Sequence, residues 1–162
     1  MKLLRVASDG QSTVRPLREI IVDTARGAPQ FTLHAVTPAS DGALLVPVRS
    51  RLPDGSIDLR VIRIDSDNQQ TEYTLPLLDE VFTGKSGWAY TTDGHTALAF
   101  EPASGEVQWS YAPPTGSITI KFVTSERALI VETAEGILKI DARGVATHEM
   151  PPTGLRDLMP WW

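Results

Sequence analysis

Residues 87–111 hold three short apolar segments separated by two turn motifs, and this pattern limits the folds open to the chain. The segments are Trp88–Tyr90, Ala97–Phe100 and Val107–Tyr111, and the turns are Thr92-Asp93-Gly94 and Pro102-Ala103-Ser104-Gly105. Glycine accepts the positive φ that tight hairpin turns require, and side chains two positions apart share one face of a strand. The region therefore predicts an antiparallel meander of three strands.

The second turn of this unit recurs elsewhere in the chain. Matching turns begin at Val6, Ile64 and Ile140, each with an apolar residue two positions earlier and with Gly or Asn near its end. A proline follows each turn, and proline ends a strand because it has no N–H for the ladder; these prolines are Pro16, Pro76, Pro113 and Pro151. From Ile64 to Phe100 is 36 residues and from Phe100 to Ile140 is 40, a period typical of four-stranded propeller blades.

The unit at 87–111 resembles the repeat of the PQQ-like, or quinoprotein-type, β-propellers. In that family a strand leads through an Asp-Gly turn to an apolar strand, followed by a Ser/Thr-Gly turn and a strand that carries Trp. Asp93-Gly94, Ala97–Phe100, Ser104-Gly105 and Trp109 occupy those positions here. The resemblance implies a fold and no cofactor, because the members that bind the quinone are much larger complete propellers.

We therefore predict an all-β protein: a partial or small β-propeller-like array of antiparallel four-stranded meanders in one domain, 1–162. The expected blades are 2–17 (partial), 31–76, 79–113 and 117–151, with a tail at 152–162. Complete propellers use at least four blades, and an unclosed array exposes strand edges. Two chains completing a ring, an open edge capped by a partner, and a different antiparallel sheet stack all remain open at this point.

Composition narrows the function classes. The chain has 162 residues, a net charge of −5 and no cysteine, so disulfides and thiolate chemistry are excluded. It has neither a basic stripe nor a run of 18 apolar residues, and we expect no nucleic-acid partner and no membrane span. The absence of cysteine is compatible with the cytoplasm, which is the localisation we predict.

Residues that could carry catalysis or bind metal are scattered. His34, His95 and His148 form no cluster in sequence, and Asp65–Asn68 lacks the Gly and Glu that a calcium-binding EF-hand loop needs. We predict no catalytic residue, cofactor or metal. A hydrolase or lyase on a propeller scaffold is the enzymatic alternative, and it requires histidines grouped with carboxylates in a pocket.

The charged hairpin expected at 49–58 is the main candidate for partner binding. Its charged residues are Arg49, Arg51, Asp54, Asp58 and Arg60, and the tail adds the aromatic pair Trp161 and Trp162. The two Trp residues either fold back on the chain's own core or anchor it to a partner or a second copy. We predict a non-catalytic protein-binding module of the adaptor or immunity (inhibitor) type, with a self-associating structural propeller subunit as an alternative.

Overall fold

The computed structural model describes residues 2–6, 12–16, 31–33 and 36–150, and the regular structure in these ranges is entirely β. The prediction of an all-β protein built from antiparallel meanders is confirmed. β1 (Lys2–Val6) pairs with β2 (Ser12–Pro16) in a two-stranded sheet. The other strands form three larger sheets, which we call sheets B, C and D.

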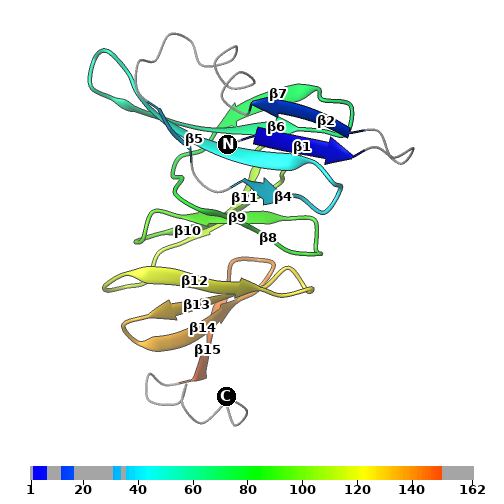
Figure 1. Cartoon of the computed structure of the whole chain (residues 1–162). Coiled ribbons are helices and arrows are strands. Elements are labelled where there is room, and N and C mark those ends of the chain that lie inside the picture. Colours follow the sequence, from blue (N-terminus) through cyan, green and yellow to red (C-terminus); the bar gives the residue numbers. More distant parts are fainter. Residues whose placement is uncertain (1, 7–11, 17–30, 34–35, 151–162) are drawn as a thin grey trace, which may run out of the picture.

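The three sheets follow one another along the chain. Sheet B comprises β3 (Phe31–Leu33), β4 (Thr37–Pro38), β5 (Leu44–Arg51), β6 (Ile57–Ile64) and β7 (Gln70–Thr74). Sheet C comprises β8 (Val81–Thr83), β9 (Ala89–Thr92), β10 (Ala97–Phe100) and β11 (Val107–Tyr111). Sheet D comprises β12 (Ile118–Val123), β13 (Leu129–Thr133), β14 (Gly136–Ile140) and β15 (Ala146–Met150). Neighbouring strands in each sheet are antiparallel, and Figure 1 shows sheet C between sheets B and D.

The recurring turn of the sequence adopts the same hydrogen bonds in all three sheets. In sheet B the N–H of Asp65 donates to the carbonyl of Gln69 at 3.1 Å, and that of Asn68 donates to Asp65 at 3.2 Å. In sheet D the turn 141–145 repeats both bonds at 2.9 Å. In sheet C the turn 101–106 makes the same pair across one additional residue, as the alignment of the sequence predicts.

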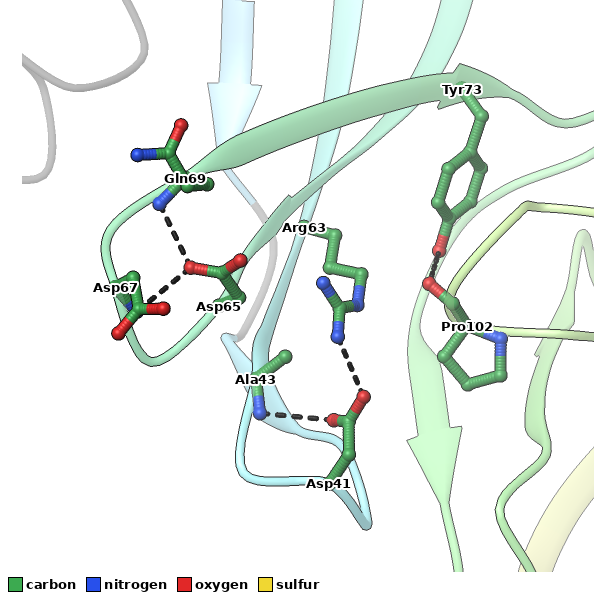
Figure 2. Close-up of polar contacts among 8 residues, drawn as sticks. All are labelled: Asp41, Ala43, Arg63, Asp65, Asp67, Gln69, Tyr73 and Pro102. Atoms are coloured by element: carbon green, nitrogen blue, oxygen red, sulfur yellow. Dashed lines mark hydrogen bonds and ion pairs between the residues drawn. The ribbon is translucent and has the colours of Figure 1, made fainter.

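Asparagine and glycine stand where this turn needs a left-handed backbone. The φ angle is +63° at Asn68, +77° at Gly105 and +79° at Gly144. Aspartate opens the turn in sheets B and D because its carboxylate accepts backbone N–H groups: Asp65 Oδ1 accepts from Asp67 at 2.9 Å and from Gln69 at 2.8 Å (Figure 2).

Sheet C is buried on both faces. All four residues of β10, Ala97–Phe100, are at most 1% exposed. Leu98 and Phe100 belong to an apolar cluster shared with sheet B, whereas Ala97 and Ala99 belong to one shared with sheet D. Because successive side chains of a strand point to opposite faces, one continuous apolar run serves both interfaces.

Hydrogen bonds join neighbouring sheets, and two of them lie between β4 and β8. The hydroxyl of Thr37 in β4 donates to the carbonyl of Val81 in β8 at 2.8 Å, and the hydroxyl of Thr83 donates back to Pro38 at 2.7 Å. At the start of β12, the N–H of Ile118 donates to the carbonyl of Gly94 at 2.9 Å. These bonds satisfy backbone carbonyls and fix how each sheet sits on the next.

One aromatic–glycine contact is repeated between successive sheets. The ring of Tyr73, in β7, lies against Gly105 in sheet C, and its hydroxyl donates to the carbonyl of Pro102 at 3.1 Å (Figure 2). Trp109, in β11, lies against Gly144 in sheet D in the same way: a Cβ added there would stand 2.9 Å from the Trp109 Cβ. Each contact therefore joins the last strand of one sheet to the final turn of the next.

The turns of the sheets gather at two opposite ends. The hairpin end carries the β5–β6, β9–β10 and β13–β14 turns, which are 52–56, 93–96 and 133–136. The other end, which we call the Arg127 end, carries the β4–β5, β8–β9 and β12–β13 turns, which are 39–43, 84–88 and 124–128. The recurring turns at 65–69, 101–106 and 141–145 also lie at the Arg127 end.

The outer face of sheet D carries both polar and apolar side chains. Thr119 and Lys121 of β12 are exposed, and Glu132 and Lys139 of the next two strands are partly exposed. The ammonium of Lys121 lies 2.5 Å from the carboxylate of Glu132. Phe122, which is 57% exposed, pairs with Ile130, and Ile137 pairs with Glu132, so three large apolar residues share this face with the charged ones. Sheet D thus has one apolar face, toward sheet C, and one face of mixed polarity.

Candidate functional site

The β5–β6 hairpin extends beyond the neighbouring sheet. Its two strands are eight residues long, whereas those of sheet C have three to five residues (Figure 1). The connecting turn is Leu52–Ser56, in which the N–H of Leu52 donates to the carbonyl of Ser56 at 2.9 Å. Gly55 has a φ of +86° with open space around it, so the tip points into solvent.

Asp54 belongs to the turn itself. Its Oδ1 atom accepts hydrogen bonds from the hydroxyl of Ser56 at 2.6 Å and from the Ser56 N–H at 2.9 Å. The hydroxyl bond first, and then the backbone bond, hold the pKa of Asp54 below its ordinary value. The carboxylate is therefore ionised at neutral pH and shapes the tip of the hairpin.

Strand alternation separates the charged residues that the sequence grouped together. Arg49 and Arg51 point to one face of the hairpin and are exposed. Asp58 and Arg60 point to the opposite face, because they lie at the alternate positions of β6, where Asp58 pairs with Ser50. The structure therefore brings Arg49 and Arg51 together, and Asp58 and Arg60 together, on different sides of the sheet.

Arg60 lies in the protein interior, with 9% of its surface exposed. Its Nε lies 2.7 Å from Asp58 Oδ2, and its Nη1 lies 3.2 Å from Glu72 Oε2. A buried guanidinium needs such partners because transferring an unpaired charge out of water is costly. Within the hairpin, Arg49 and Arg51 are consequently the cations that face solvent, and Arg60 stabilises the sheet.

A pocket of about 320 Å³ lies at the base of the exposed arginine face. It is formed by the hairpin of sheet B, the connection from β7 to β8 and the β9–β10 turn. Its lining residues are Arg49, Ile57, Leu59, Pro76, Leu77, Leu78, Asp79 and Asp93. A pocket of this volume, lined by apolar side chains together with charged groups, has room for one side chain of a partner.

The charges of the pocket have mixed sign. Arg49 supplies the cation, and Asp79 and Asp93 supply carboxylates. Burial acts to raise the pKa of Asp93, but hydrogen bonds from the N–H groups of His95 at 2.8 Å and Thr96 at 2.7 Å outweigh it and lower the pKa. Asp93 is therefore ionised at neutral pH and held in place by its own turn.

An exposed apolar side chain stands beside the pocket. Ile57 opens β6, pairs with Arg51 across the hairpin and is 46% exposed. A large apolar side chain flanked by arginines is the composition that protein interfaces favour at their centres. Arg51, Ile57 and Arg49 thus form a continuous edge that leads from the hairpin tip to the pocket.

The histidines in the described ranges do not gather. His95 lies in the turn 93–96 of sheet C, and His148 lies on β15 of sheet D. His34 lies outside the described residues, as do Trp161 and Trp162. Within the described part of the chain, no three His, Asp or Glu side chains converge as metal ligands do. Asp65–Asn68 forms the turn described above.

Sequence reasoning missed most of the pocket. It named Arg49, but not the apolar lining of Ile57, Leu59 and Leu77, nor the carboxylates of Asp79 and Asp93. The alternation of β6 would have placed Ile57 and Leu59 on the Arg51 side of the hairpin. The contribution of Leu77 and Asp79 depends on how sheets B and C pack, which a local pattern does not report.

Comparison with known proteins gives no match. No protein-family model fits the sequence, and no curated protein is significantly similar to it. The part of the chain that the structure describes holds no helix long and apolar enough to cross a membrane. The function must therefore be argued from the pocket and the hairpin.

Proposed function

We propose that the chain is a non-catalytic protein-binding module, of the adaptor or inhibitor type, that grips its partner with the β5–β6 hairpin and the pocket at its base. The observation that carries this proposal is the pocket of about 320 Å³ beside the exposed Ile57 and Arg49. An apolar side chain of the partner would enter the pocket, and the flanking charges would set its orientation.

The arrangement of the sheets suits this role. We propose that they are blades of a propeller-like array, as the resemblance to the quinoprotein-type repeat implies. The hydrogen bonds between β4 and β8 and the repeated aromatic–glycine contacts support that view, since a blade array repeats the same interface at each step. Such scaffolds carry unrelated activities, and binding resides in the loops at their ends.

The proposal is tested by comparing proteins that co-purify with four forms of the tagged chain. The forms are wild type, Ile57→Asp, Arg49→Glu and a control, Val145→Asp. Val145 matches Ile57 in exposure, at 50% against 46%, but lies at the Arg127 end of sheet D. Chemical denaturation of each form confirms that it folds.

We expect quantitative mass spectrometry to find a partner that wild type and Val145→Asp retain equally. Ile57→Asp and Arg49→Glu should lose it by at least tenfold, because a buried carboxylate or a reversed charge at an interface centre costs more than about 1.4 kcal/mol. Equal recovery by all four folded forms would refute the hairpin and its pocket as the binding site.

A further inference from the structure

Arg127 adopts a backbone conformation that the matching turns reserve for glycine. The turns 39–43, 84–88 and 124–128 join β4 to β5, β8 to β9 and β12 to β13. Their left-handed residues are Gly42 at +82°, Gly87 at +89° and Arg127 at +60°. A side chain is disfavoured at this φ, and a strained residue that persists is a reason to ask what its side chain does.

The side chain of Arg127 is exposed yet held in one orientation. Its Nε donates to the carbonyl of Ser86 at 3.1 Å, and its Cζ lies 4.9 Å from the centre of the Trp88 ring. Both partners belong to the adjacent turn of sheet C, so the guanidinium bridges two sheets. The cation–π contact and the Nε bond together hold the guanidinium in place, and neither uses its Nη groups as hydrogen-bond donors.

A second cation lies on the 84–88 loop, which holds the partners of Arg127. Lys85 is exposed and lines a pocket of about 350 Å³ whose other lining residues are Pro38, Ala39, Ser40, Thr83 and Gly84. Gly84 permits the close approach of sheet D, because a Cβ there would stand 2.6 Å from the Val123 side chain. The 84–88 loop thus carries Lys85 on the side of sheet B and supports Arg127 on the side of sheet D.

Acidic side chains also lie at the Arg127 end, and two of them are already paired with other arginines. The carboxylate of Asp41 lies 2.6 Å from the guanidinium of Arg63 (Figure 2), and that of Asp141 lies 2.8 Å from the guanidinium of Arg143. The exposed carboxylates at this end include Asp67, Glu106 and Glu126. Among the described residues, neither Lys85 nor Arg127 has a carboxylate within ion-pair distance, so the adjoining turns 84–88 and 124–128 present two unpaired cations.

We propose that Lys85 and Arg127, which adjoin through the 84–88 loop, form a second binding site whose ligand is an acidic peptide segment of a partner protein. The Nη edge of Arg127 would bind one carboxylate in the bidentate geometry that guanidinium groups favour, and the ammonium of Lys85 would bind another. The site lies at the end of the sheets opposite the hairpin, so its ability to bind a ligand does not depend on whether the hairpin pocket binds a partner.

The test uses the full chain and a synthetic peptide of alternating Glu and Gly. Nuclear magnetic resonance follows the Arg127 Nε–H and the Trp88 indole N–H during titration at low salt. We expect saturable shifts of both signals with the Glu peptide and none with a matched Gln–Gly peptide. Inorganic phosphate, titrated in parallel, should bind more weakly than the Glu peptide, since it cannot span two cations.

The decisive variant is Arg127→Gly. Glycine is the residue that the equivalent turns use, so this variant should fold at least as well as the wild type. We expect it, and Lys85→Gln, to weaken binding of the Glu peptide at least fivefold, with Lys139→Gln, on β14 of sheet D, unchanged. Binding undiminished in folded Arg127→Gly, or equal binding of the Gln–Gly peptide, would overturn the proposal. A higher affinity for phosphate than for the Glu peptide would do the same.

Discussion

Tyr73 and Gly105 are in direct contact across the interface between sheets B and C, because the aromatic ring occupies the space that any side chain at Gly105 would fill. The same relationship joins Trp109 to Gly144 between sheets C and D. A turn glycine therefore has two roles here: it permits a positive φ, and it admits the ring of the preceding sheet. The effect of each role on stability can be measured separately, by substituting a glycine that has both roles and one that has only the first.

Gly105→Ala should destabilise the protein much more than Gly94→Ala. Both glycines have positive φ, +77° and +88°, so each alanine carries a backbone cost of roughly 1–2 kcal/mol. Gly94 has open space around it, whereas a methyl at Gly105 meets the Tyr73 ring and adds roughly 1–3 kcal/mol for overpacking. Urea denaturation measures both losses. Equal losses would mean that the ring moves aside without cost.

The Tyr73 ring is the cause of that difference, and removing it should cancel the difference. In a Tyr73→Ala background, Gly105→Ala should cost no more than Gly94→Ala does in the wild type, because the overlap is gone. Tyr73→Phe, in contrast, keeps the ring and loses only the hydrogen bond to Pro102, worth about 1 kcal/mol. A double-mutant cycle by denaturation yields the coupling, and additive losses would exclude it.

Arg60→Ala should destabilise the fold by about 2 kcal/mol, whereas Arg51→Ala should change stability by less than about 0.5 kcal/mol. Removing Arg60 leaves Asp58 and Glu72 without their shared cation, and the cost is moderated because these carboxylates keep 24% and 36% of their side-chain exposure. Arg51 is exposed at the hairpin tip. Chemical denaturation checks both values, and an equally mild effect of Arg60→Ala would show that the ion network is dispensable.

Acid should weaken the fold through the turn aspartates. The guanidinium of Arg143, then the N–H groups of Val145 and Arg143, lower the pKa of Asp141 from its ordinary 3.8 to about 2. A carboxyl with a lowered pKa stabilises the folded state above about pH 4, and this contribution disappears as the pH falls toward 2. The urea midpoint should therefore drop between pH 4 and pH 2.

Asp141→Asn isolates the contribution of that charge. The amide oxygen still accepts the backbone bonds of the turn, but it does not titrate. The variant should thus show a shallower fall in the urea midpoint over the same pH range, with Asp67→Asn, at an exposed position of the matching turn, as a control. An unchanged slope in Asp141→Asn would assign the acid sensitivity to other carboxyls.

Local patterns in the sequence were enough to predict most of the strands and turns. The bounds predicted for Ala97–Phe100 and Val107–Tyr111 are those of β10 and β11, since turn residues and alternation specify such strands directly. β9 is Ala89–Thr92 rather than the predicted Trp88–Tyr90, because the ladder with β10 extends to Thr92 before the turn begins. No local pattern shows which neighbouring sheet a side chain faces. The burial of sheet C on both sides could therefore not be predicted from the sequence.

Less of the candidate site than of the fold could be predicted from the sequence. The hairpin and its turn are local features, and the solvent-facing Arg49 and Arg51 were named. Arg60 was grouped with them because it is close to them in sequence, but strand alternation places it on the opposite face of the hairpin. The pocket joins residues from two sheets, and the role of Arg127 rests on a backbone angle and a stacking contact, neither of which composition or spacing encodes.

The burial of β10 on both faces has a consequence for how a chain of this kind can grow. In arrays of stacked units each unit contacts only its neighbours, so a unit that is apolar on both sides can have another unit on either side. Sheet C has this character, because Leu98 and Phe100 pack toward sheet B and Ala97 and Ala99 toward sheet D. Lengthening this protein by gene duplication would therefore succeed by copying residues of sheet C ahead of sheet D.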